Sequence, residues 1–294
     1  MTRLSSWNFH MASYLTVNRI QREPRYWMHS DRHSIIWNIF SYLVIFLTIC
    51  YCKVMKGMLN TYAVHNKDRL HQCLYDRETN RGLVTISNHD SCMDDPLLWG
   101  ALKWKSAVQQ RHVRWIAAAH DICFTQYSHA MFFSLGKVVP VVRGDGVYQR
   151  SMDFILDKLD HGAWTHIFPE GKVNLDKTLI RFKWGVGRLI SEAKKIPVVL
   201  PMYHIGMDDI LPNKAPYYPR IRKKVTLLVG QPMEFTEDIE LMKIMKKTPA
   251  EIRKYITDKI QEEMSKLKEK AEHLHVESFK EQCGRVKYKT PCGQ

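Results

Sequence analysis

The sequence lacks the cysteine spacings of metal sites and disulfide frameworks. Its seven cysteines include no Cys-x-x-Cys pair and are scattered along the 294 residues. Structural zinc sites use closely spaced ligand pairs, and disulfide-stapled domains use an even set of cysteines. We therefore expect neither a metal ion nor a disulfide framework.

Acidic residues are scarce relative to basic ones. The chain has 30 Asp and Glu against 44 Lys and Arg, which gives a formal net charge of +14 at pH 7. Such a balance implies an anionic partner, either nucleic acid or an anionic membrane surface. No zinc-finger spacing and no aromatic RNA-binding signature accompanies the charge. We therefore expect an anionic membrane surface and no nucleic acid, with part of the charge solvating the C-terminal helices.

Linkers rich in Ser, Gly or Pro, internal repeats and low-complexity segments are also missing, which favours one domain with tails. The Arg-rich, acid-poor start is typical of a mitochondrial targeting segment. No signature indicates an oligomeric state. The expected divisions are a polar Arg-rich segment at 1–34, a membrane-associated segment at 35–52, the α/β domain at 53–235, C-terminal helices at 236–276 and a basic tail at 277–294.

An uncharged apolar run extends over residues 35–52, between Arg32 and Lys53. Eighteen helical residues rise about 27 Å, slightly less than the roughly 30 Å hydrocarbon core, so the run predicts membrane association without requiring a span. The alternative is a core helix of a soluble domain. A second apolar stretch at 122–135 either contacts lipid or forms an ordinary core helix. The residues expected to contact the membrane are Ile35, Trp37, Phe40, Leu43, Phe46 and Ile49.

Short β-branched runs alternate with helical periodicities through the middle of the chain, which predicts an α/β fold with a largely parallel, possibly mixed, sheet flanked by helices. Residues 53–80 read as a helical approach to this domain. A capping box at Thr248 to Glu251 starts an amphipathic C-terminal helix. The expected strands are 83–88, 113–118, 138–142, 164–168, 196–201 and 224–229, and the expected intervening helices are 95–104, 126–134, 146–159 and 183–194.

A His-x4-Asp pair, His89 and Asp94, follows the first predicted strand. The turn can fold back so that Asp94 accepts from one imidazole nitrogen, which leaves the other nitrogen as a general base toward an alcohol. An activated alcohol attacks an ester or thioester carbonyl. Taken alone, the pair is more often a capped turn with a surface histidine.

Three later sequence blocks favour a catalytic pair over a capped turn. Arg143 ends a strand, Glu170 lies in the turn Phe168-Pro-Glu-Gly-Lys172 after another strand, and a proline-flanked strand occupies 196–201. Because the ends of parallel strands share one edge of a sheet, we expect these residues to meet. Together with the His-x4-Asp pair, the four blocks in this order resemble the glycerolipid acyltransferase family.

That resemblance implies site roles and the fold. His89 and Asp94 correspond to the family's catalytic pair, and Arg143, Glu170, Gly171 and Lys172 to its substrate-binding blocks. The chain departs from the usual family pattern at Lys172, where threonine is common, and at the next position, where arginine is frequent. This departure makes the use of acyl-CoA doubtful.

Six longer blocks between about residues 64 and 231 resemble the family's mitochondrial transacylase branch, among them Asn88 to Pro96 and Phe168 to Asn174. That resemblance implies a CoA-independent enzyme without a cofactor that remodels cardiolipin from monolysocardiolipin, using phospholipids such as phosphatidylcholine. It also implies a location on the mitochondrial membrane leaflets that face the intermembrane space. The alternatives are an acyl-CoA-dependent lysophospholipid acyltransferase and a non-catalytic lipid-binding protein. In the transacylase reading, backbone N–H groups of the 90–93 turn are candidate hydrogen-bond donors to the oxyanion of the tetrahedral intermediate.

Overall fold

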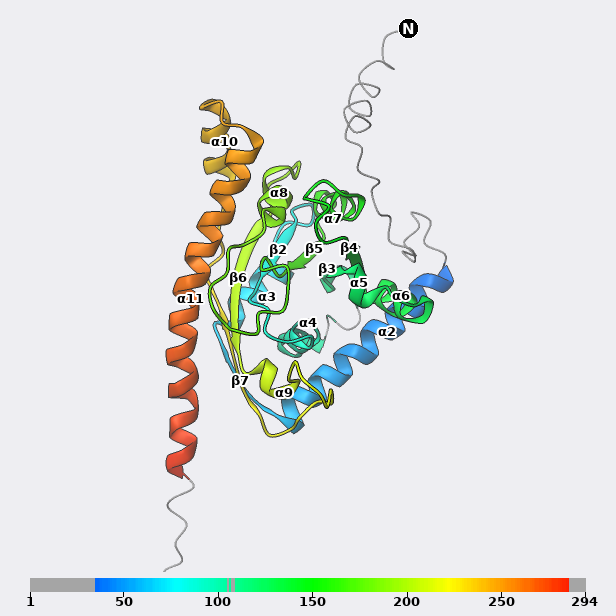
Figure 1. Ribbon diagram of the computed structural model, residues 1–294, viewed down its shortest axis with the longest axis vertical. Helices are drawn as coiled ribbons and strands as arrows, with labels where there is room; N and C mark the ends of the chain where they lie inside the picture. Colours follow the sequence, from blue (N-terminus) through cyan, green and yellow to red (C-terminus); the bar gives the residue numbers. More distant parts are fainter. Residues whose placement is uncertain (1–34, 105, 107–108, 286–294) are drawn as a thin grey trace, which may run out of the picture.

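The computed structural model describes residues 35–104, 106 and 109–285, and its centre is a seven-stranded sheet (Figure 1). The strands lie in the order β1-β7-β6-β2-β5-β3-β4, and each neighbouring pair is parallel except β6 and β7. The predicted fold class, a largely parallel sheet flanked by helices, is confirmed. The strands are β1 Thr61–His65, β2 Leu83–Ile86, β3 Trp115–Ala119, β4 Val138–Val141, β5 Trp164–Ile167, β6 Val198–Ile205 and β7 Lys224–Val229.

The two strands that lead into the candidate site, β2 and β5, are buried at every residue and pair with each other in register. Central parallel strands are covered by helices on both faces, so every residue is buried rather than every second one. In these two strands the buried residues include the polar Thr85, Thr165 and His166. Parallel pairing then brings the loops after β2 and β5 to the same edge of the sheet.

Helices form one apolar layer on each face of the sheet. One layer combines residues of α2, α3, α4 and η2, and the other combines residues of α7, α8, α10 and α11. In Figure 1, α11 runs beside β6 and β7 on one side, while α2 lies on the opposite side. The helices are α2 Ile35–Val54, η1 Met55–Leu59, α3 Lys67–Tyr75, α4 Asp94–Leu98, η2 Trp99–Ala101, η4 Gln110–His112, α5 His120–Cys123, α6 Tyr127–Leu135, α7 Arg150–Asp160, α8 Gly185–Ser191, α9 Met207–Ile210, α10 Thr236–Ile244 and α11 Pro249–Arg285.

The prediction of a purely helical segment at 53–80 is wrong in its middle. Helix α2 ends in the π-helical turn η1, the chain then forms edge strand β1, and only α3 is helical beyond it. Strand β1 exists because it pairs in parallel with β7, from Thr61 opposite Lys224 to His65 opposite Leu228. This pairing partner lies more than 150 residues away (224 − 61 = 163), so local periodicity could not indicate it.

Helix α11 begins as expected and ends later than expected. The Glu251 N–H donates to Thr248 Oγ, and the Thr248 N–H donates to the Glu251 carboxylate at 2.8 Å, which is the predicted capping box. The helix extends to Arg285, so the part of the expected basic tail at 277–285 is helical. It continues because Phe279 is buried and its ring lies under the Lys224 ammonium group, which anchors this turn to β7.

Helix α2 is attached to the domain along one stripe. Ser41, Ile45, Ile49 and Cys52 are buried at helical spacing, and Ser41 Oγ donates to the Leu135 carbonyl of α6 at 2.7 Å. The expectation that Ile49 contacts the membrane is therefore wrong, because its side chain is in the core. Ile35, Phe40, Leu43 and Phe46 are exposed on other faces, and Trp37 is half-buried.

Among the described residues, one helix, Ile35–Leu59, is long and apolar enough to cross a membrane by length and composition. The expected targeting segment at 1–34 lies outside the described residues.

Close packing of α8 on α11 allows a test of the fold. A Cβ on Gly187 would collide with the Arg253 carbonyl oxygen and lie 2.7 Å from Thr257 Oγ. We expect Gly187→Ala to lower the free energy of unfolding by about 2 kcal/mol, because overpacking a tight helix contact forces backbone shifts. Denaturant unfolding followed by circular dichroism measures this change. Gly57→Ala is the control, since its Cβ would meet no atom within 4 Å; equal destabilisation of both variants would contradict the packing argument.

Candidate active site

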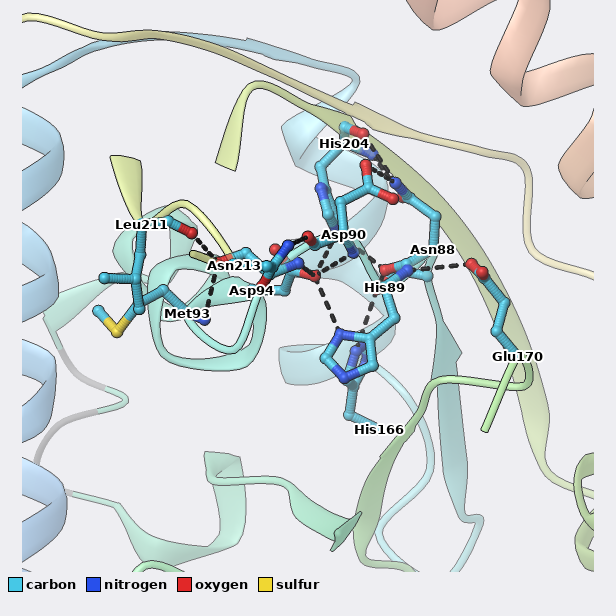
Figure 2. Close-up of polar contacts among 12 residues, drawn as sticks. Asn88, His89, Asp90, Met93, Asp94, His166, Glu170, His204, Leu211 and Asn213 are labelled. Carbon is cyan, nitrogen blue, oxygen red and sulfur yellow. Dashed lines mark hydrogen bonds and ion pairs between the residues drawn. The ribbon is translucent and has the colours of Figure 1, made fainter. Parts of the chain in front are cut away.

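The predicted pair His89 and Asp94 is assembled at the end of β2. Asp94, the first residue of α4, is fully buried, and its Oδ2 lies 3.0 Å from His89 Nδ1 (Figure 2). The same oxygen accepts the backbone N–H groups of Asp90 at 2.6 Å and Ser91 at 2.8 Å. This network favours the tautomer with the proton on Nδ1, which leaves Nε2 of the partly exposed ring as a proton acceptor.

The loop after β5 holds the backbone of His89 from both sides. Glu170 Oε1 accepts the His89 N–H at 3.0 Å, and the Asn174 N–H donates to the His89 carbonyl at 2.7 Å. Gly171 provides the turn between them with a φ of +70°, a conformation that favours glycine. Burial raises the pKa of the Glu170 carboxyl. Glu170 therefore positions the histidine through its main chain.

An aromatic ring fixes the plane of the imidazole. Phe168 stacks on His89 with ring centroids 4.0 Å apart and an interplanar angle of 11°. On Phe168, a second ring, that of His166, packs edge to face, with ring centroids 4.7 Å apart. His166 Nδ1 lies 2.8 Å from Thr85 Oγ, and its Nε2 lies 3.2 Å from Ser87 Oγ. Burial lowers the pKa of His166 well below its ordinary value, so this second ring is neutral at physiological pH.

A further set of polar side chains, which the sequence analysis did not identify, connects the turn that carries His89 to β6. The Asn88 amide exchanges two hydrogen bonds of 2.9 Å with the backbone of His204, and its nitrogen also donates to Asp90 Oδ2. His204 Nε2 lies 2.8 Å from the Asn88 carbonyl and 3.6 Å from Asp94 Oδ2. The available signal was a single histidine near the end of an otherwise apolar strand.

Most of the backbone donors expected to bind an oxyanion are already engaged. In the 90–93 turn, Asp90 and Ser91 donate their N–H groups to Asp94, and the Met93 N–H donates to Ser91 Oγ at 3.2 Å. Among the described contacts, the Cys92 N–H alone in this turn has no intramolecular acceptor. The turn therefore supplies one candidate donor rather than four.

The predicted substrate-binding cations lie outside this hydrogen-bonded cluster. Arg143, just after β4, is about half exposed, and its Nε lies 3.7 Å from Asp121 Oδ1. Lys172 is exposed on the turn that also carries Gly171. In the part of the chain that the structure describes, neither cation hydrogen-bonds to His89, Asp94 or Glu170. The structure thus unites three of the predicted residues and leaves the two cations at the periphery.

Within the described residues, no group of His, Cys, Asp and Glu side chains is arranged to hold a metal ion. The geometry provides instead an oriented imidazole whose Nε2 can remove a proton from a hydroxyl group and whose Nδ1 is steadied by a buried carboxylate. Removal of that proton would make the hydroxyl oxygen a nucleophile, as acyl transfer to an alcohol requires.

Comparison with known proteins agrees with this geometry. Residues 61–205 match the model of the Acyltransferase family. The chain is also 38% identical over 205 residues to an N-acylphosphatidylethanolamine synthase of Arabidopsis thaliana, covering 68% of this chain and 72% of the relative. The chain belongs to the acyltransferase family.

Within that family, the chain is similar to proteins named tafazzin. It is 47% identical over 244 residues to the tafazzin of Drosophila melanogaster, covering 83% of this chain, and 32% identical over 216 residues to that of Saccharomyces cerevisiae, covering 61%. The chain spans 65% of the length of the fly relative and 57% of the yeast relative.

A solved structure shares the fold. The crystal structure of the 1-acyl-sn-glycerophosphate acyltransferase of Thermotoga maritima superposes with a TM-score of 0.50 at 17% sequence identity, covering 80% of this chain and 95% of the other.

The stacking of Phe168 on His89 predicts how changes of the Phe168 ring affect the reaction. A positive imidazolium above a ring face gains about 0.5–2 kcal/mol, and His89 becomes positive only when it has taken a proton. We therefore expect Phe168→Leu to lower the kcat of acyl transfer about tenfold, with Phe168→Tyr near the wild-type value. Stepwise fluorination of this ring, which weakens its negative face without changing its shape, should lower kcat progressively. The same fluorinated residues at the buried Phe235 are the control; a flat series at Phe168 would assign the ring to packing alone.

Proposed function

We propose that the chain is a CoA-independent transacylase that moves acyl chains between phospholipids and lysophospholipids. The observation that carries the proposal is the His89–Asp94 pair, with its 3.0 Å contact and a free ring nitrogen at the end of β2. Similarity to the tafazzins and membership of the acyltransferase family support it.

In the proposed reaction, the hydroxyl of a lysophospholipid lies beside His89 Nε2, which accepts its proton. The hydroxyl oxygen bonds to the acyl carbonyl carbon of a second phospholipid and forms a tetrahedral oxyanion. The bond from that carbon to the donor glycerol oxygen then breaks, and the imidazolium returns the proton to this oxygen. One phospholipid and one lysophospholipid enter and one of each leaves, so no cofactor is consumed.

Different groups around the His89–Asp94 pair stabilise the imidazolium, the oxyanion and the lipid phosphates. Asp94 stabilises the imidazolium, since its Oδ2 faces Nδ1 and is itself held by two backbone donors. The Cys92 N–H is the donor in this turn that remains for the oxyanion. Arg143, whose Nε lies 3.7 Å from Asp121 Oδ1, and the exposed Lys172 bind lipid phosphates, the first as a planar fork and the second as a point charge.

The proposed substrates are cardiolipin and monolysocardiolipin, with phosphatidylcholine as an acyl donor. The net charge of +14 suits lipids with two phosphates per headgroup. The proposed location is mitochondrial, on the leaflets that face the intermembrane space. The names of the tafazzin relatives support this assignment.

Membrane attachment is proposed for the exposed faces of α2. Ile35 is 79% exposed, and further apolar side chains are exposed along the helix. Helix α6 packs on α2 and adds the exposed rings of Tyr127 and Phe132. Because the buried stripe ties α2 to the domain from Ser41 to Cys52, the helix lies in the interface beside the domain rather than leaving it to span the bilayer.

The catalytic proposal is tested with purified protein in bilayers of isotopically labelled phospholipid and lysophospholipid, without CoA, with the products read by mass spectrometry. We expect wild-type transfer, and a loss of at least about a thousandfold in His89→Ala, because the base is removed. Asp94→Asn should be nearly as impaired. A folded His89→Ala protein with near-wild-type turnover would refute the mechanism.

The same assay distinguishes the alternatives. Transfer that requires added acyl-CoA would identify a CoA-dependent acyltransferase, and binding without turnover in any lipid mixture would identify a lipid-binding protein.

The attachment proposal is tested on exposed residues, since deleting 35–52 would also remove core side chains such as Ile45 and Ile49. We expect Phe40→Ser/Leu43→Ser to weaken co-sedimentation with vesicles at least about tenfold, because two apolar side chains no longer enter lipid. Leu241→Ser/Ile244→Ser is the control, as these apolar residues are at least as exposed and lie on the distant α10. Wild-type protein should be extracted from membranes by carbonate; full retention would indicate a span.

A further inference from the structure

The segment that runs from Leu211, just after α9, to Lys224, the first residue of β7, combines exposed aromatic side chains with positive charge that no nearby acidic residue neutralises. No acidic residue occurs between Asp209 and Glu234. Tyr217 is 73% exposed, Tyr218 59% and Ile221 50%. In the described part of the chain, no carboxylate forms an ion pair with any of the cations of this segment, which are Lys214, Arg220, Arg222, Lys223 and Lys224.

This 211–224 segment lies against the end of the α2–η1 helix. The Arg222 N–H donates to the Leu59 carbonyl at 2.6 Å, and the Lys223 N–H donates to Asn60 Oδ1 at 2.8 Å. Met58, at this end of the helix, is 80% exposed. Figure 1 shows the segment beside the C-terminal end of α2, where Val54 and Met58 are exposed.

The chemistry of the segment fits the surface of an anionic bilayer. Tyrosine rings favour the headgroup level, where the ring is in an apolar environment and the hydroxyl is in water. Unpaired Arg and Lys side chains beside them gain energy from anionic headgroups. A protein partner would require acidic groups of defined geometry, whereas this surface is a strip of cations and rings adjoining an apolar helix.

The other end of the same segment contacts the catalytic turn. Ser91 Oγ donates to the Leu211 carbonyl at 2.8 Å, and Asn213 Nδ2 donates to the Asp90 carbonyl at 2.6 Å (Figure 2). Asp90 and Ser91 are the residues whose N–H groups hold the Asp94 carboxylate. The segment is therefore hydrogen-bonded directly to the turn that orients His89.

We propose that residues 211–224 form a second, charge-selective membrane contact that couples docking on an anionic bilayer to the geometry of the catalytic turn. The coupling rests on the proposed transacylase function, whereas the membrane contact does not. The segment thus adds selectivity for anionic surfaces to the apolar attachment by α2, and activity per bound molecule increases on such surfaces.

Binding is tested with the full chain and vesicles of phosphatidylcholine, with or without phosphatidylglycerol. Arg220→Gln/Arg222→Gln should weaken co-sedimentation with the anionic vesicles about 10- to 30-fold, since each basic side chain near such a surface contributes about a factor of five. Binding to neutral vesicles should not change. Lys243→Gln/Lys246→Gln, the same charge change in the last turn of α10 and just after it, at the other end of the molecule, is the control. Equal binding by Arg220→Gln/Arg222→Gln and wild type, or equal losses in both double variants, would overturn the contact.

Coupling is tested by turnover per bound molecule. Wild-type turnover should increase severalfold on vesicles containing phosphatidylglycerol, and Asn213→Ala should bind these vesicles normally but lose the increase. Arg220→Gln/Arg222→Gln should keep wild-type turnover in neutral mixed micelles. Turnover that is independent of anionic lipid, or an increase that persists in Asn213→Ala, would overturn the coupling. Absence of turnover in every lipid mixture would instead refute the proposed function, and the binding result would still decide whether the contact exists.

Discussion

The arrangement around the site depends on the satisfaction of one buried carboxylate. Asp94 is fully buried, and an isolated ionised carboxylate there would carry a large desolvation cost. Its Oδ2 meets part of this requirement by accepting hydrogen bonds from two backbone N–H groups and from His89 Nδ1–H, while Oδ1 is buried without a hydrogen-bond partner among the described residues. The turn after β2 must fold back to present those donors. The direction of the imidazole is therefore a consequence of how a buried charge is solvated by the protein.

Strand order provides the second constraint. Because β2 and β5 are neighbours in register, the loop carrying Glu170 emerges beside the loop carrying His89, although 81 residues separate the two. The β5 loop then binds both backbone polar groups of His89 and stacks Phe168 on its ring. Catalytic groups held on rigid strand ends by main-chain hydrogen bonds keep their geometry better than groups on free loops. The sheet determines the position of the histidine, and the carboxylate determines its orientation.

The sequence was sufficient for those parts that follow local rules. Strand ends, the His-x4-Asp turn and the α11 capping box each depend on residues close together, and parallel alternation implied that His89 and Glu170 would meet. Strand β1 was not predicted, because its pairing with β7 is non-local. His204 was not identified, because its contact with Asn88 joins β6 to the end of β2. Ile49 was misplaced for a related reason. An apolar helix gives no periodicity to indicate which stripe faces the domain, so only packing could decide it.

Membrane contact and catalysis are linked by the nature of the proposed reaction. In transfer between two lipids, both acyl donor and acceptor reside in a bilayer, so the dyad must work where lipids can reach it. If α2 left the domain to span the membrane, only the chain connection after the helix would join the site to the bilayer. Helix α2 instead shares its buried stripe with the core, and its end is hydrogen-bonded to the segment that also contacts Asp90. The surface that would bind lipid is thus hydrogen-bonded to the turn that orients the base, and docking then determines where the base lies relative to the bilayer.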